Sequence, residues 1–129
     1  MPIMTWFIDV DLTLIDIDDK LLPGVEDGLR WMAITKGYKL YCWSAGGEDY
    51  ARRMLAKNGI LHFFRDVFDK PDGIIDDSPE HLLNPHRVIK INRKDDWTRI
   101  KDLIFRKDTS LSGKEEDEEI PNGIRPWTG

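Results

Sequence analysis

The chain has 129 residues, of which 40% are hydrophobic and 33% charged, and its net charge is −5. These values are typical of one soluble globular domain with its own core. The acidic balance argues against broad binding of nucleic-acid backbones, although a local basic patch could hold a nucleic-acid end. No apolar stretch approaches the roughly 20 residues that cross a bilayer, so no membrane partner is expected. No basic region followed by a long apolar one stands in the first residues, so secretion is not expected. Cys42 is the one cysteine and is expected to be a buried thiol, so the expected location is a reducing cytoplasm.

Apolar runs alternate with helical patterns along the chain, which indicates βαβ units around a mainly parallel sheet. The first strand is predicted at residues 4–8. A polar stretch then leads to Pro23-Gly24, a turn signal placed directly before a helix. Apolar residues recur at helical spacing from Val25 to Ala33, and Lys36-Gly37 supplies a cation and a glycine suited to the helix end.

A second strand and helix follow directly. The strand is predicted at residues 38–43 and the helix at 48–57, with Asn58-Gly59 as its stop. The residues of this helix that are expected to face the core are Tyr50, Met54 and Leu55. Residues 63–68 mix apolar and charged side chains, which indicates a short helical or irregular connection.

The sequence predicts two more strands and a last helix. Residues 73–75 read as a short third strand that ends on Asp76-Asp77, and residues 87–91 as a fourth. Asp95 or Asp96 could cap a helix that carries apolar side chains at helical spacing from Trp97 onward.

The helical pattern fails after Lys107. Beyond this point a run of acidic residues at 115–119 stands between glycines and prolines, a composition typical of a solvated or disordered tail. The sequence therefore predicts a folded domain at residues 1–107 and an acidic tail at 108–129.

Asp9 and Asp11 stand one residue apart at the end of the first predicted strand. Open parallel sheets build metal and phosphate sites where buried strands deliver carboxylates at their carboxyl ends. Two carboxylates held this close repel each other unless a cation lies between them, and Mg²⁺ has the required preference for oxygen. From this segment alone, an edge strand that leads into a solvated acidic turn remains the alternative.

Four elements at or near strand ends follow one another along the chain: Asp9-x-Asp11-x-Thr13, Ser44, Lys70 and Asp76-Asp77. In this order they resemble the four motifs of the haloacid dehalogenase-like superfamily of phosphohydrolases, over residues 3–107. The resemblance implies an α/β, Rossmann-like three-layer sandwich with a mainly parallel sheet. The stretches that carry an inserted cap domain in many members are short here, so the chain resembles a compact, capless member with an open site.

The resemblance implies a Mg²⁺-dependent phosphatase that hydrolyses a phosphomonoester. Asp9 would attack phosphorus and form an aspartyl-phosphate. Asp11 would protonate the leaving group and then serve as the base for water. Mg²⁺ would be held by the Asp9 carboxylate, the Asp11 backbone carbonyl and Asp76.

The remaining motif residues would bind the phosphoryl group or support the site. Ser44 would donate to a phosphoryl oxygen, together with backbone N–H groups around Ala45. Thr13 would support the loop after the first strand, and Asp77 would orient waters or the lysine in the outer shell.

Lys70 would neutralise the transferring phosphoryl group and keep the nucleophile ionised. It stands closer in sequence to Asp76 than the lysine of many family members does, so Lys57 and Lys90 are the alternatives for this role.

An open site suits a large substrate, such as a phosphorylated protein or a nucleic-acid end. A weakly active or non-catalytic relative, which binds phosphate or a partner through the same pocket, is the alternative function. The sequence leaves open whether water or another acceptor receives the phosphoryl group, and which oligomer forms.

A calcium-binding EF-hand loop that starts at Asp9 is excluded, because its sixth and twelfth positions hold Leu14 and Lys20 in place of Gly and Glu. A two-component receiver domain is excluded because Ser44 stands where its phosphoacceptor aspartate belongs.

Overall fold

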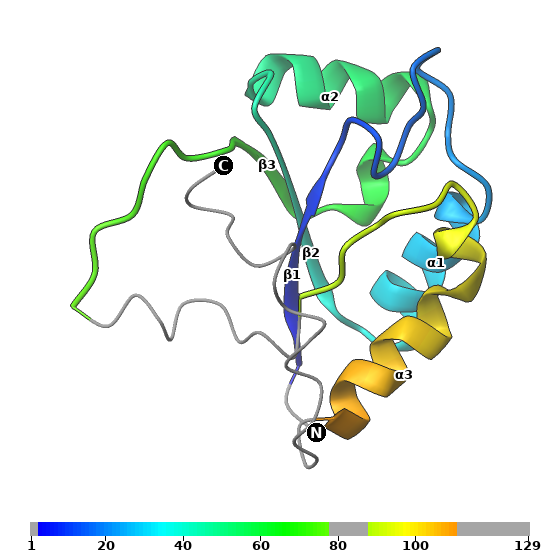
Figure 1. Cartoon of the computed structure of the whole chain (residues 1–129). Helices are drawn as coiled ribbons and strands as arrows, with labels where there is room; N and C mark the ends of the chain where they lie inside the picture. Colours follow the sequence, from blue (N-terminus) through cyan, green and yellow to red (C-terminus); the bar gives the residue numbers. More distant parts are fainter. Residues whose placement is uncertain (1–2, 78–87, 111–129) are drawn as a thin grey trace. The chain divides into compact units, whose positions relative to one another are not determined.

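The computed structural model describes residues 3–77 and 88–110, which belong to two compact units. The first unit contains the chain up to Lys70 together with Arg93–Thr98, and the second contains Pro71–Asn92 and the residues from Arg99 on. Figure 1 traces the chain. The elements that bear the first three sequence motifs all belong to the first unit.

A three-stranded parallel sheet in the order β1-β2-β3 forms the centre of the first unit. The strands are β1 (Thr5–Asp9), β2 (Lys39–Ser44) and β3 (Asp66–Asp69). In the register of the sheet, Cys42 lies between Ile8 and Val67. Parallel neighbours need a crossover connection, and each crossover here carries a helix.

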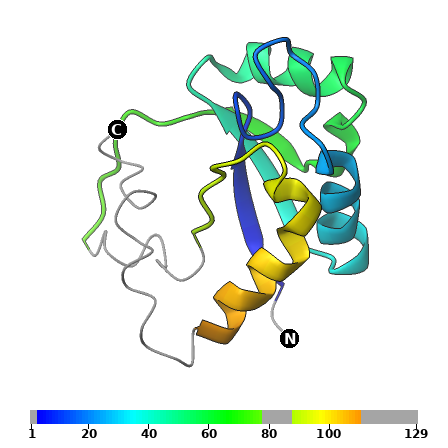
Figure 2. The ribbon, with the colours of Figure 1, turned by 45° about the vertical axis from the view of Figure 1, so that its right-hand side comes forward.

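The two crossover helices cover the same face of the sheet (Figures 1 and 2). They are α1 (Val25–Arg30), which continues as a π-helical turn at Trp31–Thr35, and α2 (Glu48–Lys57). The sheet residues that face these helices are at most 7% exposed: Ile8, Leu40, Cys42 and Val67. Burial therefore alternates along each strand, and the core lies between the sheet and these two helices.

The structure confirms an α/β fold with a parallel sheet, and the predicted β1, β2 and α2 with bounds within one residue at each end. The first helix is confirmed as well, with Gly37 beyond its end at a φ of 71°. Met54 and Leu55 of α2 are buried as expected. Local periodicity and glycine stops were sufficient for these elements.

The predicted third strand was wrong in position. Residues 63–68 do not form a mere connection, because a 3₁₀ turn at Leu61–Phe63 leads into β3 at Asp66–Asp69. Residues 73–77 contain no strand, and neither do residues 88–91, the described part of the predicted fourth strand.

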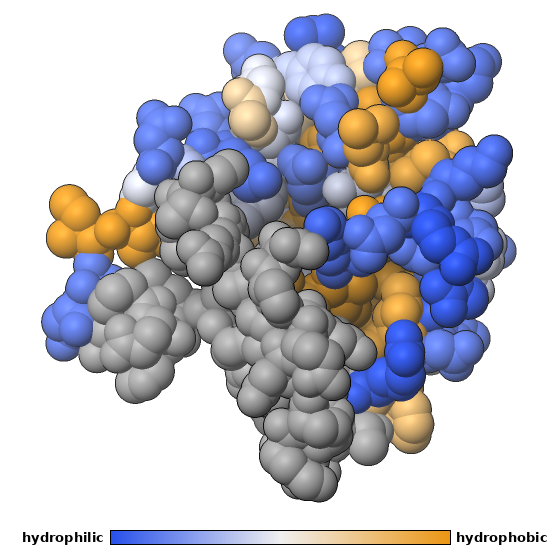
Figure 3. All heavy atoms as spheres, viewed as in Figure 1, coloured by the Kyte–Doolittle hydropathy of each residue, from blue (hydrophilic) through white to orange (hydrophobic). Residues whose placement is uncertain are grey.

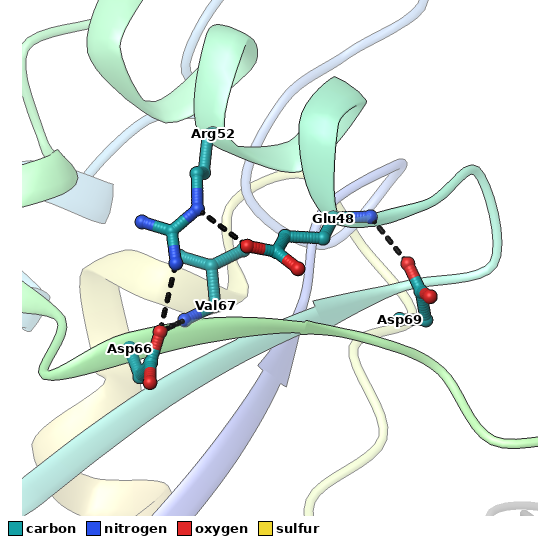
Figure 4. A network of polar contacts seen from close by, with 5 residues as sticks. All are labelled: Glu48, Arg52, Asp66, Val67 and Asp69. Atoms are coloured by element: carbon teal, nitrogen blue, oxygen red, sulfur yellow. Dashed lines mark hydrogen bonds and ion pairs between the residues drawn. The ribbon is translucent and has the colours of Figure 1, made fainter.

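Charges at both ends of β3 are matched by α2, which explains why this acidic segment can be a strand (Figure 4). Arg52 donates from Nη2 to Asp66 Oδ1 at 2.8 Å and from Nε to Glu48 Oε2 at 2.9 Å. The backbone N–H of Glu48 donates to Asp69 Oδ1 at 2.6 Å. These contacts of Asp66 and Asp69 with α2 join residues that are far apart in sequence, so a local sequence pattern does not reveal them.

The chain turns helical again at Asp96–Arg99, a 3₁₀ turn, and continues as α3 (Ile100–Ser110). The Asp96 carboxylate accepts the N–H of Arg93, which stands before the helix, at 3.0 Å. A capping side chain accepts from the second or third residue of its helix, so this contact does not confirm the predicted cap. The helix extends past Lys107, while residues 111–129 of the expected tail lie outside the described ones.

In the second unit, Ile75 is fully exposed and Ile74 is 39% exposed, and hydrophobic atoms stand out at this segment in Figure 3. Within residues 3–77 and 88–110, no helix has the length and apolar character that a membrane crossing requires.

Candidate active site

The chain folds back tightly after β1. The Val10 carbonyl accepts the N–H groups of Thr13, Leu14 and Ile15 at 3.2, 2.9 and 3.3 Å. Leu12 has a φ of 61°, a left-handed conformation that is uncommon for a non-glycine residue and often found at functional sites. This turn places Asp11 directly beyond Asp9, the last residue of β1.

Asp9 lies half-buried among polar groups. Burial raises the pKa of its carboxyl, because a low-dielectric surrounding disfavours the charged form. The charge of Lys70 opposes this and lowers the pKa, as does a hydrogen bond from the Val10 N–H. The charge of Asp11 raises the pKa of Asp9, and a hydrogen bond with the Thr13 side chain lowers it. Asp9 is therefore a carboxyl whose charge depends on a neighbouring cation.

Lys70 is brought to the site by β3, which it follows directly. Its N–H donates to the Ser44 carbonyl at 2.9 Å, so the backbone of Lys70 runs beside the end of β2. Its Nζ lies 5.9 Å from the centre of the Trp43 ring. Trp43 is the register partner of Asp9. The structure thus places Lys70 near Asp9, while Lys57 ends α2 and Lys90 belongs to the second unit.

Ser44 ends β2 and is only 1% exposed. Its Oγ accepts the Gly46 N–H at 3.0 Å, and its carbonyl accepts the Gly47 N–H at 3.1 Å. A hydroxyl that accepts can still donate its own proton. Ala45, the next residue, is exposed.

Tyr50 is a site residue that the sequence analysis missed. Its hydroxyl donates to Asp11 Oδ1 at 2.5 Å, across 39 residues of sequence. This hydrogen bond is the main reason why the pKa of Tyr50 is raised to about 12. The helical pattern assigns Tyr50 to the core face of α2, but its side chain is only partly buried and its hydroxyl reaches the loop after β1. The signal that could have identified it is its place in the first turn of the helix that follows Ser44.

Gly46 gives the Tyr50 ring room. A Cβ atom at this position would lie 3.1 Å from the ring's Cδ2 and 3.4 Å from Ser44 Oγ. A side chain here would press on both groups, so glycine at this position serves the site through close packing.

The two acids of the fourth motif lie in the second unit. Asp76 and Asp77 are exposed, in a segment that has neither helix nor strand. Of the acids predicted to hold or support a metal ion, Asp9 and Asp11 belong to the first unit, and Asp76 and Asp77 to the second. Across the described ranges, no three His, Cys, Asp or Glu side chains gather as a metal site would require.

Cys42 is fully buried on the helix side of the sheet, as the sequence analysis expects. Burial, together with the charge of Asp9, raises the pKa of its thiol to about 12. Nucleophilic chemistry requires a thiolate, so Cys42 is a packing residue.

Comparison with known proteins was made by family, by curated protein and by solved structure. No match was found in any of the three. The arguments for function therefore rest on this chain's own residues.

Proposed function

We propose that this protein is a Mg²⁺-dependent phosphomonoesterase that works through an aspartyl-phosphate on Asp9. The observation that supports this most is the meeting of Asp9, Ser44 and Lys70 at the carboxyl ends of three adjacent parallel strands. Phosphoryl transfer through an aspartyl-phosphate uses a carboxylate nucleophile, a cation and hydrogen-bond donors around the phosphoryl oxygens. The same residues carry the resemblance to the haloacid dehalogenase-like superfamily, whose capless three-layer fold is part of the proposal.

The proposed reaction has two steps. The Asp9 carboxylate attacks phosphorus, the bond to the substrate oxygen breaks, and Asp11 gives that oxygen a proton. Asp11 then takes a proton from a water molecule, which attacks phosphorus and releases inorganic phosphate with Asp9 restored. Lys70 balances the charge of the phosphoryl group in both steps, and Ser44 donates to one of its oxygens.

The donors at the site fit Mg²⁺. The Asp9 carboxylate and the Asp11 carbonyl are oxygen ligands of the kind that this ion prefers. Burial raises the pKa of Asp9, so a cation that favours the ionised carboxylate is needed there. When bound, Mg²⁺ would screen the repulsion between Asp9 and an anionic phosphate.

The test is release of phosphate from an aryl phosphate with Mg²⁺ and with a chelator, for wild type, Lys70→Met and Lys57→Met. We expect turnover that requires Mg²⁺ and falls about 100-fold in Lys70→Met, because one positioned charge in a low-dielectric site has an effect of this size. Lys57→Met, the matched control at the end of α2, should retain wild-type turnover. Turnover in chelator, or full turnover in Lys70→Met, would contradict the proposal.

Tyr50→Phe should lower kcat about tenfold with little change in KM, because the lost hydrogen bond holds Asp11 and no substrate. Adding this substitution to Asp11→Asn should cause no further loss, because Tyr50 is proposed to act only through the carboxyl group that Asp11→Asn removes. Steady-state kinetics on the single and double variants measure this. Tyr38→Phe, which removes a tyrosine hydroxyl elsewhere in the unit, is the control. A higher KM with unchanged kcat would contradict the role in orienting Asp11.

The burial of Ser44 also fits a second candidate function. A hydroxyl that is 1% exposed suits a closed phosphate-binding turn as well as a reactive one. A protein of this kind would bind phosphate or a phosphorylated partner with little or no turnover. Calorimetry with inorganic phosphate separates the two functions, because only the binding protein would bind phosphate while turning over no ester.

A further inference from the structure

The sheet face opposite α1 and α2 carries a cluster of aromatic side chains, here called the aromatic face: Phe7, Tyr41, Trp43 and Phe68. The Phe7 ring centre lies 5.3 Å from that of Tyr41, 4.8 Å from that of Trp43 and 6.2 Å from that of Phe68. Phe7 is 46% exposed and Phe68 is 40% exposed. Three strands thus contribute to one continuous array of rings that solvent reaches.

Such exposure is unusual for a parallel sheet. Parallel strands are generally covered on both faces and read as continuous apolar runs. Here Leu40, Cys42 and Val67 are buried on one face, while on the other face Tyr41 and Trp43 are partly buried and Phe7 and Phe68 are exposed. Contiguous exposed apolar surface of this kind often marks a binding site.

The aromatic face leads directly into the candidate active site. Phe7 and Asp9 are two residues apart in β1, so their side chains leave the same face of the sheet. Lys70 Nζ lies 5.9 Å from the centre of the Trp43 ring, and its charge acts on Asp9. A ligand that uses both features must join a phosphate group to flat, apolar rings.

We propose that the substrate is the phosphorylated end of a single-stranded nucleic acid, with its terminal phosphate at Asp9 and Lys70 and its bases on the aromatic face. This rests on the proposed phosphatase function and adds the substrate class. Aromatic side chains on a sheet surface stack on bases of any sequence, because every base has a π-face. The array draws its rings from three adjacent strands.

The charge of the chain sets the extent of this contact. A net charge of −5 disfavours a long run of phosphate contacts, so recognition is confined to the terminal phosphate and the bases next to it. Lys39 leaves β2 on the same face as Tyr41 and is a further cation along the path. A second copy of the chain or an apolar peptide could cover the rings but would bring no phosphate to Lys70.

The experiment compares kcat/KM in Mg²⁺ for a terminally phosphorylated single-stranded oligonucleotide, a mononucleotide, a phosphopeptide and a small alkyl phosphate. The enzymes are wild type, Phe7→Leu/Phe68→Leu, and Ile34→Ala as a control at an exposed hydrophobic residue of the π-helical turn. Leucine keeps the sites apolar but removes the rings. We expect wild type to prefer the oligonucleotide, and the double variant to lose at least about tenfold on it and nothing on the alkyl phosphate. Ile34→Ala should match wild type on all four.

Preference for the phosphopeptide, or an equal loss on every substrate, would overturn the proposal. Sedimentation that shows a dimer for wild type and a monomer for the double variant would also overturn it, since a second copy would then occupy the face. Binding of an unphosphorylated oligonucleotide, followed by tryptophan fluorescence, tests the face without turnover. If no substrate is turned over but the oligonucleotide binds to wild type and not to the double variant, the proposed phosphatase function is wrong and the aromatic face is still a binding site. If alkyl phosphate is hydrolysed but this binding is absent, the reverse holds.

Discussion

Asp9→Asn is expected to reduce kcat/KM for phosphate release at least about 1000-fold, the largest effect of any single change in this chain. An amide has no charged oxygen to attack phosphorus and cannot form the acyl phosphate on which the reaction depends. Initial rates in Mg²⁺ measure the loss. Mass spectrometry of acid-quenched wild type should show a phosphorylated peptide that contains Asp9, and the variant should show none.

Asp27→Asn is the matched control, because it removes an acid from the exposed side of α1, where its carboxylate is 3.6 Å from Arg30. It should leave the rate unchanged. Retained turnover in Asp9→Asn would mean that water attacks the phosphate directly or that another residue is the nucleophile.

Asp9→Asn should not be less stable than wild type, which separates loss of chemistry from loss of fold. Burial raises the pKa of Asp9, so the folded state disfavours the ionised carboxylate and loses stability as the pH rises through that pKa. Asparagine carries no charge at any pH. In chelator at pH 7, denaturant unfolding should show Asp9→Asn at least as stable as wild type, and the difference should vanish toward acid pH. A variant that unfolds more easily at pH 7 would contradict this account.

Gly24→Ala is expected to destabilise the protein by about 2–5 kcal/mol, the largest effect on stability predicted here. Gly24 has a φ of 81°, where a Cβ is strained, and an added Cβ would lie 2.8 Å from the Thr98 nitrogen. The carbonyl carbon of Trp97 would be 2.9 Å away. Both atoms belong to the backbone and cannot turn aside as a side chain would. Urea unfolding of wild type and variant measures the difference in free energy.

Gly37→Ala separates the two causes. Gly37 has a φ of 71°, similar to that of Gly24, but an added Cβ would meet no atom within 4 Å. This control should lose only the backbone contribution, about 1–2 kcal/mol. Equal losses in both variants would show that the close approach to Thr98 has no energetic role.

The elements that the sequence predicted correctly are those set by local pattern. Strands β1 and β2 and the two crossover helices have clear periodicity and glycine stops. Strand β3 was missed because its acidic ends are balanced by Arg52 and by the Glu48 N–H, which come from another element. The apolar run at residues 73–75 satisfies the pattern of a strand, but a strand also needs a hydrogen-bonding neighbour, which a pattern does not supply.

The candidate site follows the same division. Asp9 and Ser44 were predictable together, because the carboxyl ends of neighbouring parallel strands meet at one edge of a sheet. The position of Lys70 depends on β3, so its nearness to Asp9 follows from an element that the sequence did not predict. Tyr50 was missed because a helical pattern indicates which face of the helix a side chain occupies, but not which group its hydroxyl contacts.

The Trp97 side chain ties the loop after β1 to a distant part of the chain. Its indole N–H donates to the Thr13 carbonyl at 2.6 Å, across 84 residues of sequence, and the side chain is buried. Contacts of such separation form late, and a chain emerging from the ribosome cannot make this one until Trp97 has been synthesised. The loop that carries Asp11 is thus completed only after Trp97 has been synthesised, and shorter nascent chains hold the first motif without this hydrogen bond.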